Sequence, residues 1–216
     1  MSSLSFNGTS DFARATPTVT SFPYTMCSWF YCTSFAAARG IVHLNNSSST
    51  LQRAGLQVFT SGVLRMAAAD TANTSSDTVN TVTASTWQLA TGVFTSATSR
   101  KVILNGDIAN AGSSATSRTP TGLNRFSIGV NDASTQTIFF IGQIWATGLW
   151  SAALTDEEIV AMWKGFPMGS IRPQSLKQFF PYPGLSGRDW LGANSLAATG
   201  ATANANTPSI PHPVGH

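Results

Sequence analysis

Acidic side chains are the first candidates for chemistry, and they are few: the chain of 216 residues has nine Asp and Glu. Hydrolysis of a glycosidic bond needs two carboxylates placed across that bond. The only glutamates, Glu157 and Glu158, are adjacent at the start of an expected helix, and no two acids alternate along an expected strand. The sequence therefore predicts that the protein is not a glycosidase.

Histidine is also scarce. His212 and His216 lie close to the carboxyl end, and His43 is the remaining one. A Ser-His-Asp triad or a histidine metal cluster needs a His placed beside specific partners, and a single His in the body of the chain gives little to build on. We interpret His43 as a loop or core residue and expect no enzymatic activity.

The charge pattern limits the class of partner. The chain has 12 Lys and Arg, a formal net charge of +3 and only 10% charged residues. Arg100 and Lys101 are the only adjacent basic pair, whereas nucleic-acid binding needs clustered cations that neutralise successive phosphates. No apolar run approaches the roughly 18 residues of a transmembrane helix, and the first residues lack the pattern of a secretory signal. We expect neither a nucleic-acid nor a membrane partner.

Cys27 and Cys32 are the two cysteines, five positions apart in one expected strand. Residues with this spacing point to opposite faces of a strand and lie roughly 16 Å apart, beyond the reach of a disulfide. We expect two free thiols in or near a core.

Alternating apolar and polar residues, interrupted by turn residues at short intervals, predict a β-sandwich or barrel. Residues 56–60 and 63–66 read as a hairpin whose loop includes Gly62, a residue that tolerates a positive φ. Residues 87–104 contain the next pair of strands, which ends at the turn signal Asn105-Gly106. These turns predict strands that follow one another in meander order.

Two further elements are expected before residue 170. Residues 137–150 have apolar side chains at both odd and even positions, which predicts a central strand covered on both faces. Near residues 155–164 the period changes to that of a helix: Thr155 can cap its first turn, and Gly165 follows its last. We therefore expect one short helix.

From about residue 171 the composition shifts to Pro, Gly, Ala, Asn and Thr. Proline at this density disfavours a central strand and favours extended chain. We predict a domain at residues 1–170 and an arm at 171–216 that docks on its own domain or on a neighbour and is dispensable for folding. The aromatic residues that we expect to form an interface are Phe179, Phe180, Tyr182 and Trp190.

Three stretches resemble the laminin-G-like (concanavalin A-like lectin/glucanase) jelly rolls. The first spans Leu4–Phe12 and Pro23–Phe30, and the second is Trp87–Gly106. The third runs from Phe126 through Leu149-Trp150-Ser151-Ala152-Ala153-Leu154-Thr155-Asp156-Glu157-Glu158-Ile159, the most specific match. The resemblance covers about residues 2–166. It implies an all-β fold: a two-sheet antiparallel jelly-roll β-sandwich with one short helix and an extended C-terminal arm.

The resemblance also implies possible ligands. Many laminin-G-like domains hold calcium with carboxylate and carbonyl oxygens, and the donors available here are Asp107 and Asp132 with Asn105 and Asn131. The aspartate of the family's Val-Asp-Gly turn is Asn105 in this chain, which weakens the case for calcium, and we expect no cofactor. A sugar site would need an aromatic platform. The candidate tryptophans for it are Trp29, Trp87, Trp145 and Trp150, but each sits in a strand pattern and is interpreted by default as a core residue.

We hypothesise that the protein is a non-enzymatic phage virion component, most simply a capsid decoration (cement) protein. The expected partners are copies of itself, favouring a trimer, and the major capsid protein or other virion proteins. A surface poor in charge suits such packing because little charge must be desolvated. The expected location is the virion, assembled in the host cytoplasm and released by lysis. The alternative is a carbohydrate-binding, lectin-like module of a tail adhesin or a secreted bacterial protein.

Overall fold

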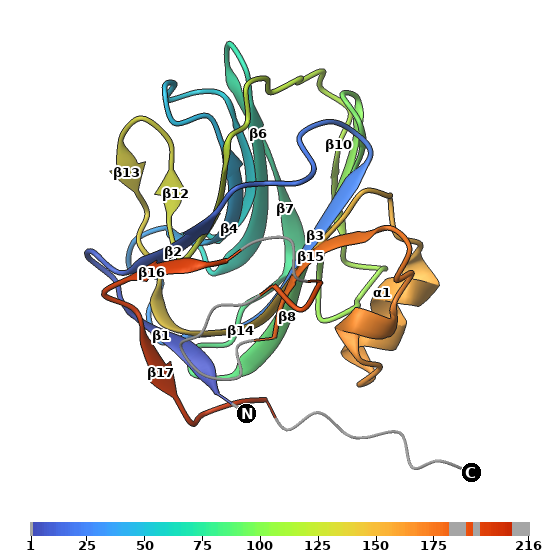
Figure 1. Cartoon of the computed structure of the whole chain (residues 1–216). Helices are drawn as coiled ribbons and strands as arrows, with labels where there is room; N and C mark the ends of the chain where they lie inside the picture. The colour runs from blue at the N-terminus through green and yellow to red at the C-terminus, as the bar shows by residue number, and fades with distance from the viewer. Residues whose placement is uncertain (1, 182–188, 192–194, 209–216) are drawn as a thin grey trace.

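A computed structural model describes residues 2–181, 189–191 and 195–208 of the chain. Strands dominate this part and form two large antiparallel sheets that pack as a sandwich (Figure 1). One α-helix, α1 (Asp156–Trp163), and one short 3-10 helix, η1 (Met168–Ser170), accompany the sheets. The predicted all-β jelly roll is confirmed. Within the described residues, no helix is long and apolar enough to cross a membrane.

The eight-stranded sheet follows the order β10-β9-β8-β3-β14-β1-β17, and β15 pairs with β14 beside this path. Its strands are β10 (Gly112–Ser114), β9 (Ser99–Leu104), β8 (Trp87–Ser96), β3 (Tyr24–Cys32), β14 (Ile141–Trp150), β1 (Ser3–Asn7), β17 (Thr202–Asn204) and β15 (Leu176–Phe180).

The seven-stranded sheet follows the order β16-β2-β11-β4-β5-β6-β7, and a separate hairpin joins β12 to β13. Its strands are β16 (Ala197–Thr199), β2 (Phe12–Ala15), β11 (Arg125–Ile128), β4 (Arg39–Asn45), β5 (Arg53–Val58), β6 (Val63–Ala69) and β7 (Asn73–Thr81). The hairpin consists of β12 (Asn131–Asp132) and β13 (Gln136–Thr137).

The inward-facing side chains of the two sheets form the main core. Phe30 of β3 and Ile144 of β14 belong to one buried cluster with Leu56 of β5 and Phe126 of β11. Alternation along each strand supplies these residues, since successive side chains point to opposite faces of a sheet. Each such side chain stabilises the fold by about 1.5–3 kcal/mol on transfer from water.

A second core lies on the outer face of the eight-stranded sheet, beneath α1, which Figure 1 shows beside this sheet. Trp150 of β14 and Ile159 of α1 are both fully buried in it. Thr155 and Glu158 form a capping box at the start of α1, as the sequence predicts for the cap. Strand β14 therefore contributes to both cores, which confirms its expected central position.

The turn and cysteine predictions also agree with the structure. Gly62 joins β5 to β6 with φ +79°, and Asn105 and Gly106 both adopt positive φ after β9. Cys27 and Cys32 are free and lie in different cores, on opposite faces of β3. Burial raises the pKa of the Cys27 thiol to about 12, so this thiol remains protonated.

The segment predicted to be an arm is extended, and its described residues add strands to both sheets of the same chain. β15 pairs with β14, while β16 pairs with β2 and β17 pairs with β1. The short link at Gly200 thus connects an edge of one sheet to an edge of the other. Pairing at sheet edges explains why a proline-rich segment can form strands at all, since an edge leaves one side of the backbone unpaired.

Candidate functional site

The structure does not bring the calcium candidates into a metal site. Asp107 Oδ2 accepts hydrogen bonds from the side-chain amides of Asn110 at 2.8 Å and Asn80 at 3.1 Å. Asn105 Oδ1 accepts from the Leu89 backbone N–H at 2.8 Å, so this residue stabilises a turn. Among the described residues, no group of three or more His, Cys, Asp or Glu is placed to hold a metal ion.

Asp132 is fully buried, and two arginines bind its carboxylate. Arg14 Nε lies 2.5 Å from Oδ2, and an Arg125 guanidinium nitrogen lies 2.9 Å from Oδ1. Gln136 donates a further hydrogen bond to Oδ1 at 3.0 Å. With two cations beside it, this carboxylate ties the β12–β13 hairpin to β2 and β11 instead of offering ligands to calcium.

His43 is a buried residue on the seven-stranded sheet. Burial, together with the nearby positive charge of Arg53, lowers the pKa of its imidazole to about 3. It is therefore neutral at physiological pH, and its Nδ1 has no hydrogen-bond partner in the described structure. Glycines at positions 40 and 55 make room for the ring, since a Cβ at Gly40 would lie 2.9 Å from His43 Cε1.

The glutamates have structural roles at α1. Glu158 Oε2 accepts the Thr155 backbone N–H at 2.7 Å and pairs with Arg172 at 2.7 Å. Glu157 lies next to it in the first turn of the same helix. Adjacent residues of a helix point in different directions, so these two carboxylates do not face each other across a substrate.

The predicted interface aromatics occupy different environments. Phe180 is fully buried in the core between the sheets, so its side chain does not reach a neighbouring subunit. Phe179, on the opposite face of β15, belongs to the second core. Trp190 is 73% exposed, and its neighbour Leu191 is 44% exposed. Tyr182 lies outside the described residues.

The four tryptophans considered as platforms also divide. Trp29 and Trp150 are buried, and the Trp29 ring stacks on that of Trp163 at 5.4 Å. Trp87 is half-buried and donates its indole N–H to Asn206 Oδ1 at 3.2 Å. Trp145 is half-buried beside the second core, and its own N–H has no described partner. Of these four, Trp145 therefore has the features of a ligand contact.

A bulge in β14 positions Trp145. Ala146 has φ +51°, and the pairing with β3 shifts register between Trp145 and Thr147. The other edge of β14 changes partner at the same place: it pairs with β1 as far as Ile144 and with β15 from Thr147 onward. Bulges of this kind reorient a side chain and interrupt pairing next to binding sites.

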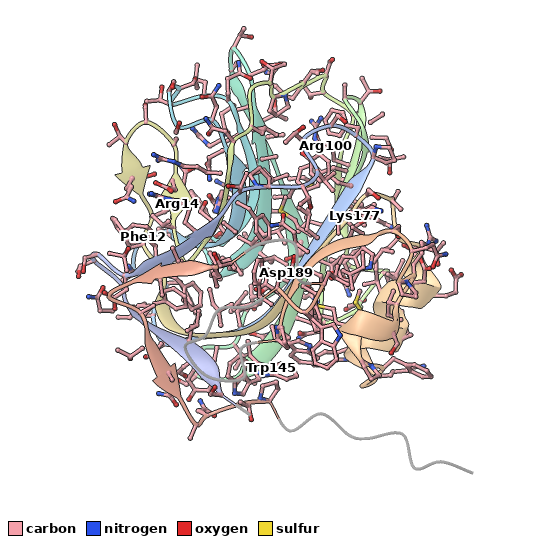
Figure 2. All side chains as sticks on the ribbon, in the orientation of Figure 1. Phe12, Arg14, Arg100, Trp145, Lys177 and Asp189 are labelled. Carbon is pink, nitrogen blue, oxygen red and sulfur yellow. The ribbon has the colours of Figure 1, made fainter. Side chains whose placement is uncertain are left out.

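Asp189 positions the Trp190 segment through hydrogen bonds to backbone N–H groups. Its Oδ1 accepts hydrogen bonds from the backbone N–H of Phe179 at 2.9 Å and of Leu191 at 3.1 Å. The Trp190 N–H in turn donates to the Phe179 carbonyl at 2.8 Å. Two hydrogen bonds thus attach the segment of this exposed indole to Phe179 in β15, and the third, from Leu191 to Asp189, closes a turn within the segment. Figure 2 shows Asp189 beside β15 and Trp145 below it, both far from Arg100.

These residues enclose a cavity of about 460 Å³, here called the aromatic pocket. It is lined by Trp145, Pro167, Gly169, Ser170, Phe179, Pro181 and Trp190. A volume of this size suits a small ligand, and aromatic walls with a few polar groups are typical of such sites. Ser170 supplies a hydroxyl to the lining, while its backbone N–H donates to the Pro167 carbonyl at 2.9 Å. The Trp145 N–H is buried and has no described partner.

The sequence indicates part of this pocket. The sequence indicates Trp145 as a core residue or sugar platform and Trp190 as an interface residue, and it assigns no role to Asp189. An acid directly before a tryptophan in a proline-rich segment is the signal that could have drawn attention to it. Nothing in residues 141–150 marks the bulge, because Ala146 is not a residue type that favours positive φ.

Comparisons with solved structures agree with this fold. A Bacteroides ovatus protein described as a candidate carbohydrate-binding protein matches with TM-score 0.68 at 16% identity, over 94% of this chain and 59% of that one. The heptameric SAP-like pentraxin of Limulus polyphemus matches with TM-score 0.63 at 14% identity, over 94% of each chain. The CBM40 module of a Ruminococcus gnavus sialidase, bound to α2,3-sialyllactose, matches with TM-score 0.58 at 17% identity, over 66% of this chain and 83% of that one.

At these identities the structural matches establish the fold alone. A search of curated proteins finds no match to the sequence. A family model, the concanavalin A-like lectin/glucanases superfamily (Laminin_G_3), matches residues 6–160. This range holds most of both sheets and most of α1, and the chain therefore belongs to the concanavalin A-like lectin/glucanases superfamily.

Proposed function

We propose that the protein is a non-catalytic carbohydrate-binding protein whose ligand occupies the aromatic pocket. Members of the same fold bind glycans, as the sialyllactose complex of the R. gnavus module illustrates. Function is not transferred with a fold, however, so the proposal depends on the pocket itself.

The observation that carries the proposal is the fixed exposure of Trp190. A large apolar side chain that is 73% exposed loses the stabilisation of burial, yet two hydrogen bonds to Phe179 of β15 hold its backbone segment in place. A rigid aromatic surface loses little conformational entropy when a ligand packs against it. The face of a pyranose ring is rich in C–H groups, and an indole offers the matching apolar surface.

Polar recognition would come from the edge of the pocket. The Trp145 N–H is buried and lacks a partner among the described residues. Such a group costs free energy until an acceptor reaches it, and a sugar hydroxyl or ring oxygen is a suitable acceptor. Neither Trp145 nor Trp190 lies beside a pair of carboxylates that could perform hydrolysis, which is why binding without turnover is proposed.

A glycan array followed by isothermal titration calorimetry tests this proposal. We expect at least one glycan to bind, Trp190→Ala to abolish the binding, and Val79→Ala to leave it unchanged. Val79 is the matched control because it is 74% exposed on β7 of the other sheet. Unaltered binding in Trp190→Ala would show that the glycan binds outside the aromatic pocket. An array without any bound glycan would refute the proposed function.

A second candidate is the virion role, with capsid decoration as its simplest form. The exposed apolar side chains of Phe166, Trp190 and Leu191 on a surface with few charges favour it, because such side chains are suited to protein contacts. In that case the chain would be present in hundreds of copies per purified particle, and Trp190→Ala would weaken its attachment. Quantitative mass spectrometry of particles and sedimentation of the free protein, including the expected trimer, test this candidate.

A further inference from the structure

We infer that the ligand is a linear oligosaccharide of several units, and that a second sugar subsite extends the aromatic pocket along the outer face of the eight-stranded sheet. The inference rests on the proposed carbohydrate-binding function and names the class of glycan. The second subsite, here called the amide subsite, consists of Tyr31, Trp87, Gln143 and Asn206.

Strand register places the amide subsite directly beside Trp145. Gln143 precedes Trp145 by two residues on β14, before the bulge, so both side chains point to the outer face of the sheet, roughly 7 Å apart. Gln143 pairs with Tyr31 of β3, and Tyr31 pairs with Trp87 of β8. Residues directly opposite each other on antiparallel strands bring their side chains together on one face. The amide subsite is therefore a row of side chains next to the wall of the aromatic pocket that Trp145 forms.

Two rings give the amide subsite an apolar surface. The ring centroids of Tyr31 and Trp87 lie 5.7 Å apart, with their planes tilted by 53°. Both side chains are half-buried, so part of each ring is exposed, whereas Trp29 in the next row is buried against Trp163. A ring held by its neighbours offers apolar surface to the C–H face of a pyranose and loses little conformational entropy on binding.

Two side-chain amides provide polar groups beside these rings. Asn206, which follows β17, donates from Nδ2 to Gln143 Oε1 at 3.0 Å, and its Oδ1 accepts the Trp87 indole N–H at 3.2 Å. Ser3 Oγ donates to the Asn206 carbonyl at 2.6 Å and fixes the backbone at this place. Each side-chain amide has two donor hydrogens and an acceptor oxygen with two lone pairs, so capacity for sugar hydroxyl groups remains. Trp87 would contribute its ring face alone, because Asn206 already accepts its N–H.

The two subsites together favour an extended ligand. The aromatic pocket reaches Trp190 beside β15, and the amide subsite reaches Trp87 on β8. Strands β15, β14, β3 and β8 are consecutive neighbours, so three strand spacings, roughly 14 Å, separate these two ends across the sheet. A single sugar ring is too short to contact both ends, whereas a linear oligosaccharide can. Joining two weak contacts in one ligand raises its affinity.

Isothermal titration calorimetry with a length series of the glycan identified on the array tests this inference. We expect a hexasaccharide to bind the wild-type protein at least about tenfold more tightly than the corresponding disaccharide. Tyr31→Ala and Gln143→Ala should remove most of this gain and leave the affinity for the disaccharide unchanged, because only the longer ligand reaches the amide subsite. Gln57→Ala is the matched control: Gln57 is half-buried on β5 of the other sheet, and its loss should change neither affinity.

Tyr31→Ala could destabilise the sheet, so Gln143→Ala, which removes only a half-buried amide, is the second variant, and thermal denaturation checks that both fold. Equal affinities of the two ligands for the wild-type protein would overturn the inference and leave the proposed function standing. A length effect that survives Gln143→Ala, or an equal loss for both ligands in this variant, would also overturn the amide subsite. Binding of neither ligand would overturn the proposed function and, with it, the inference.

Discussion

The ring centroids of Trp190 and Phe179 lie 6.4 Å apart, with their planes tilted by 49°. This contact links an exposed residue to a buried strand, because Phe179 belongs to the second core and the next residue, Phe180, to the first. The pocket therefore depends on β15 being docked in the eight-stranded sheet. If the proposed function holds, ligand binding and folding of the C-terminal segment are coupled through this strand.

Separate substitutions of Asp189 and Trp190 should distinguish a residue that positions the pocket wall from a residue that would contact a ligand. Asp189→Ala leaves the N–H groups of Phe179 and Leu191 without their acceptor, so we expect a loss of about 1–3 kcal/mol in the free energy of unfolding. Trp190→Ala removes an exposed side chain and should change stability by less than about 0.5 kcal/mol. Urea denaturation followed by circular dichroism measures both; equal stability losses would contradict these assigned roles.

The C-terminal segment should be required for folding. The structure argues against a dispensable arm, because Phe180 is fully buried between the sheets and β15 pairs with β14 from Thr147 to Trp150. Phe180→Ala should therefore cost about 3–5 kcal/mol. Truncation after Ser170, which also removes β16 and β17, should give a chain that does not fold cooperatively. A truncated protein with a sharp thermal transition and native circular dichroism would support the prediction that the arm is dispensable for folding.

The sequence predicts the parts of the fold that local patterns encode. The cap of α1 at Thr155 and the turn at Asn105-Gly106 are set by residues close in sequence, so their signals are local. The strand at Leu176–Phe180 could not be predicted in the same way. Its place depends on pairing with β14, about thirty residues earlier, and the nearby prolines argue against a strand until that edge position is known.

The candidate site was harder to predict because it joins distant segments. Trp145 enters the pocket through a bulge at Ala146, a residue that carries no bulge signal. Trp190 lines the pocket because the neighbouring Asp189 fixes its segment, through hydrogen bonds from partners in β15 and in the adjacent turn. Composition identified the aromatic residues, and only the tertiary structure shows which of them meet.

A second prediction from packing concerns Gly55 and His43. A Cβ at Gly55 would overlap the His43 imidazole ring and also lie 2.7 Å from the Val42 carbonyl oxygen. Gly55→Ala should therefore destabilise the protein by about 1–3 kcal/mol. Combining it with His43→Ala should cost less than the sum of the single changes, because the overlap is partly relieved. Additive losses in a double-mutant cycle would show that the two residues do not compete for space.

The last prediction concerns pH. The pKa of His43 is about 3 in the folded protein, below its ordinary value of 6.5, chiefly because burial disfavours the charged imidazolium. The unfolded chain therefore binds a proton at a pH where the folded protein does not. The contribution of His43 to stability is full above pH 6.5 and is lost as the pH falls toward 3. Between these limits the expected slope is about 1.4 kcal/mol per pH unit.

Urea denaturation at pH 7, 6, 5 and 4 measures this loss. The range ends above pH 3.8, the ordinary pKa of Asp70, whose own pKa is lowered to about 2 by backbone hydrogen bonds, the one from the Thr119 N–H first. The stabilisation from Asp70 is fully present well above pH 3.8 and begins to be lost as the pH approaches that value, so Asp70 adds a smaller loss only between pH 5 and 4, and the slope between pH 6 and 5 reports on His43. His43→Gln removes the titrating ring and should flatten the pH dependence, even if its stability at pH 7 is lower. His43 is the only His within the described residues. An unchanged slope in His43→Gln would therefore show that the acid sensitivity comes from groups other than His43.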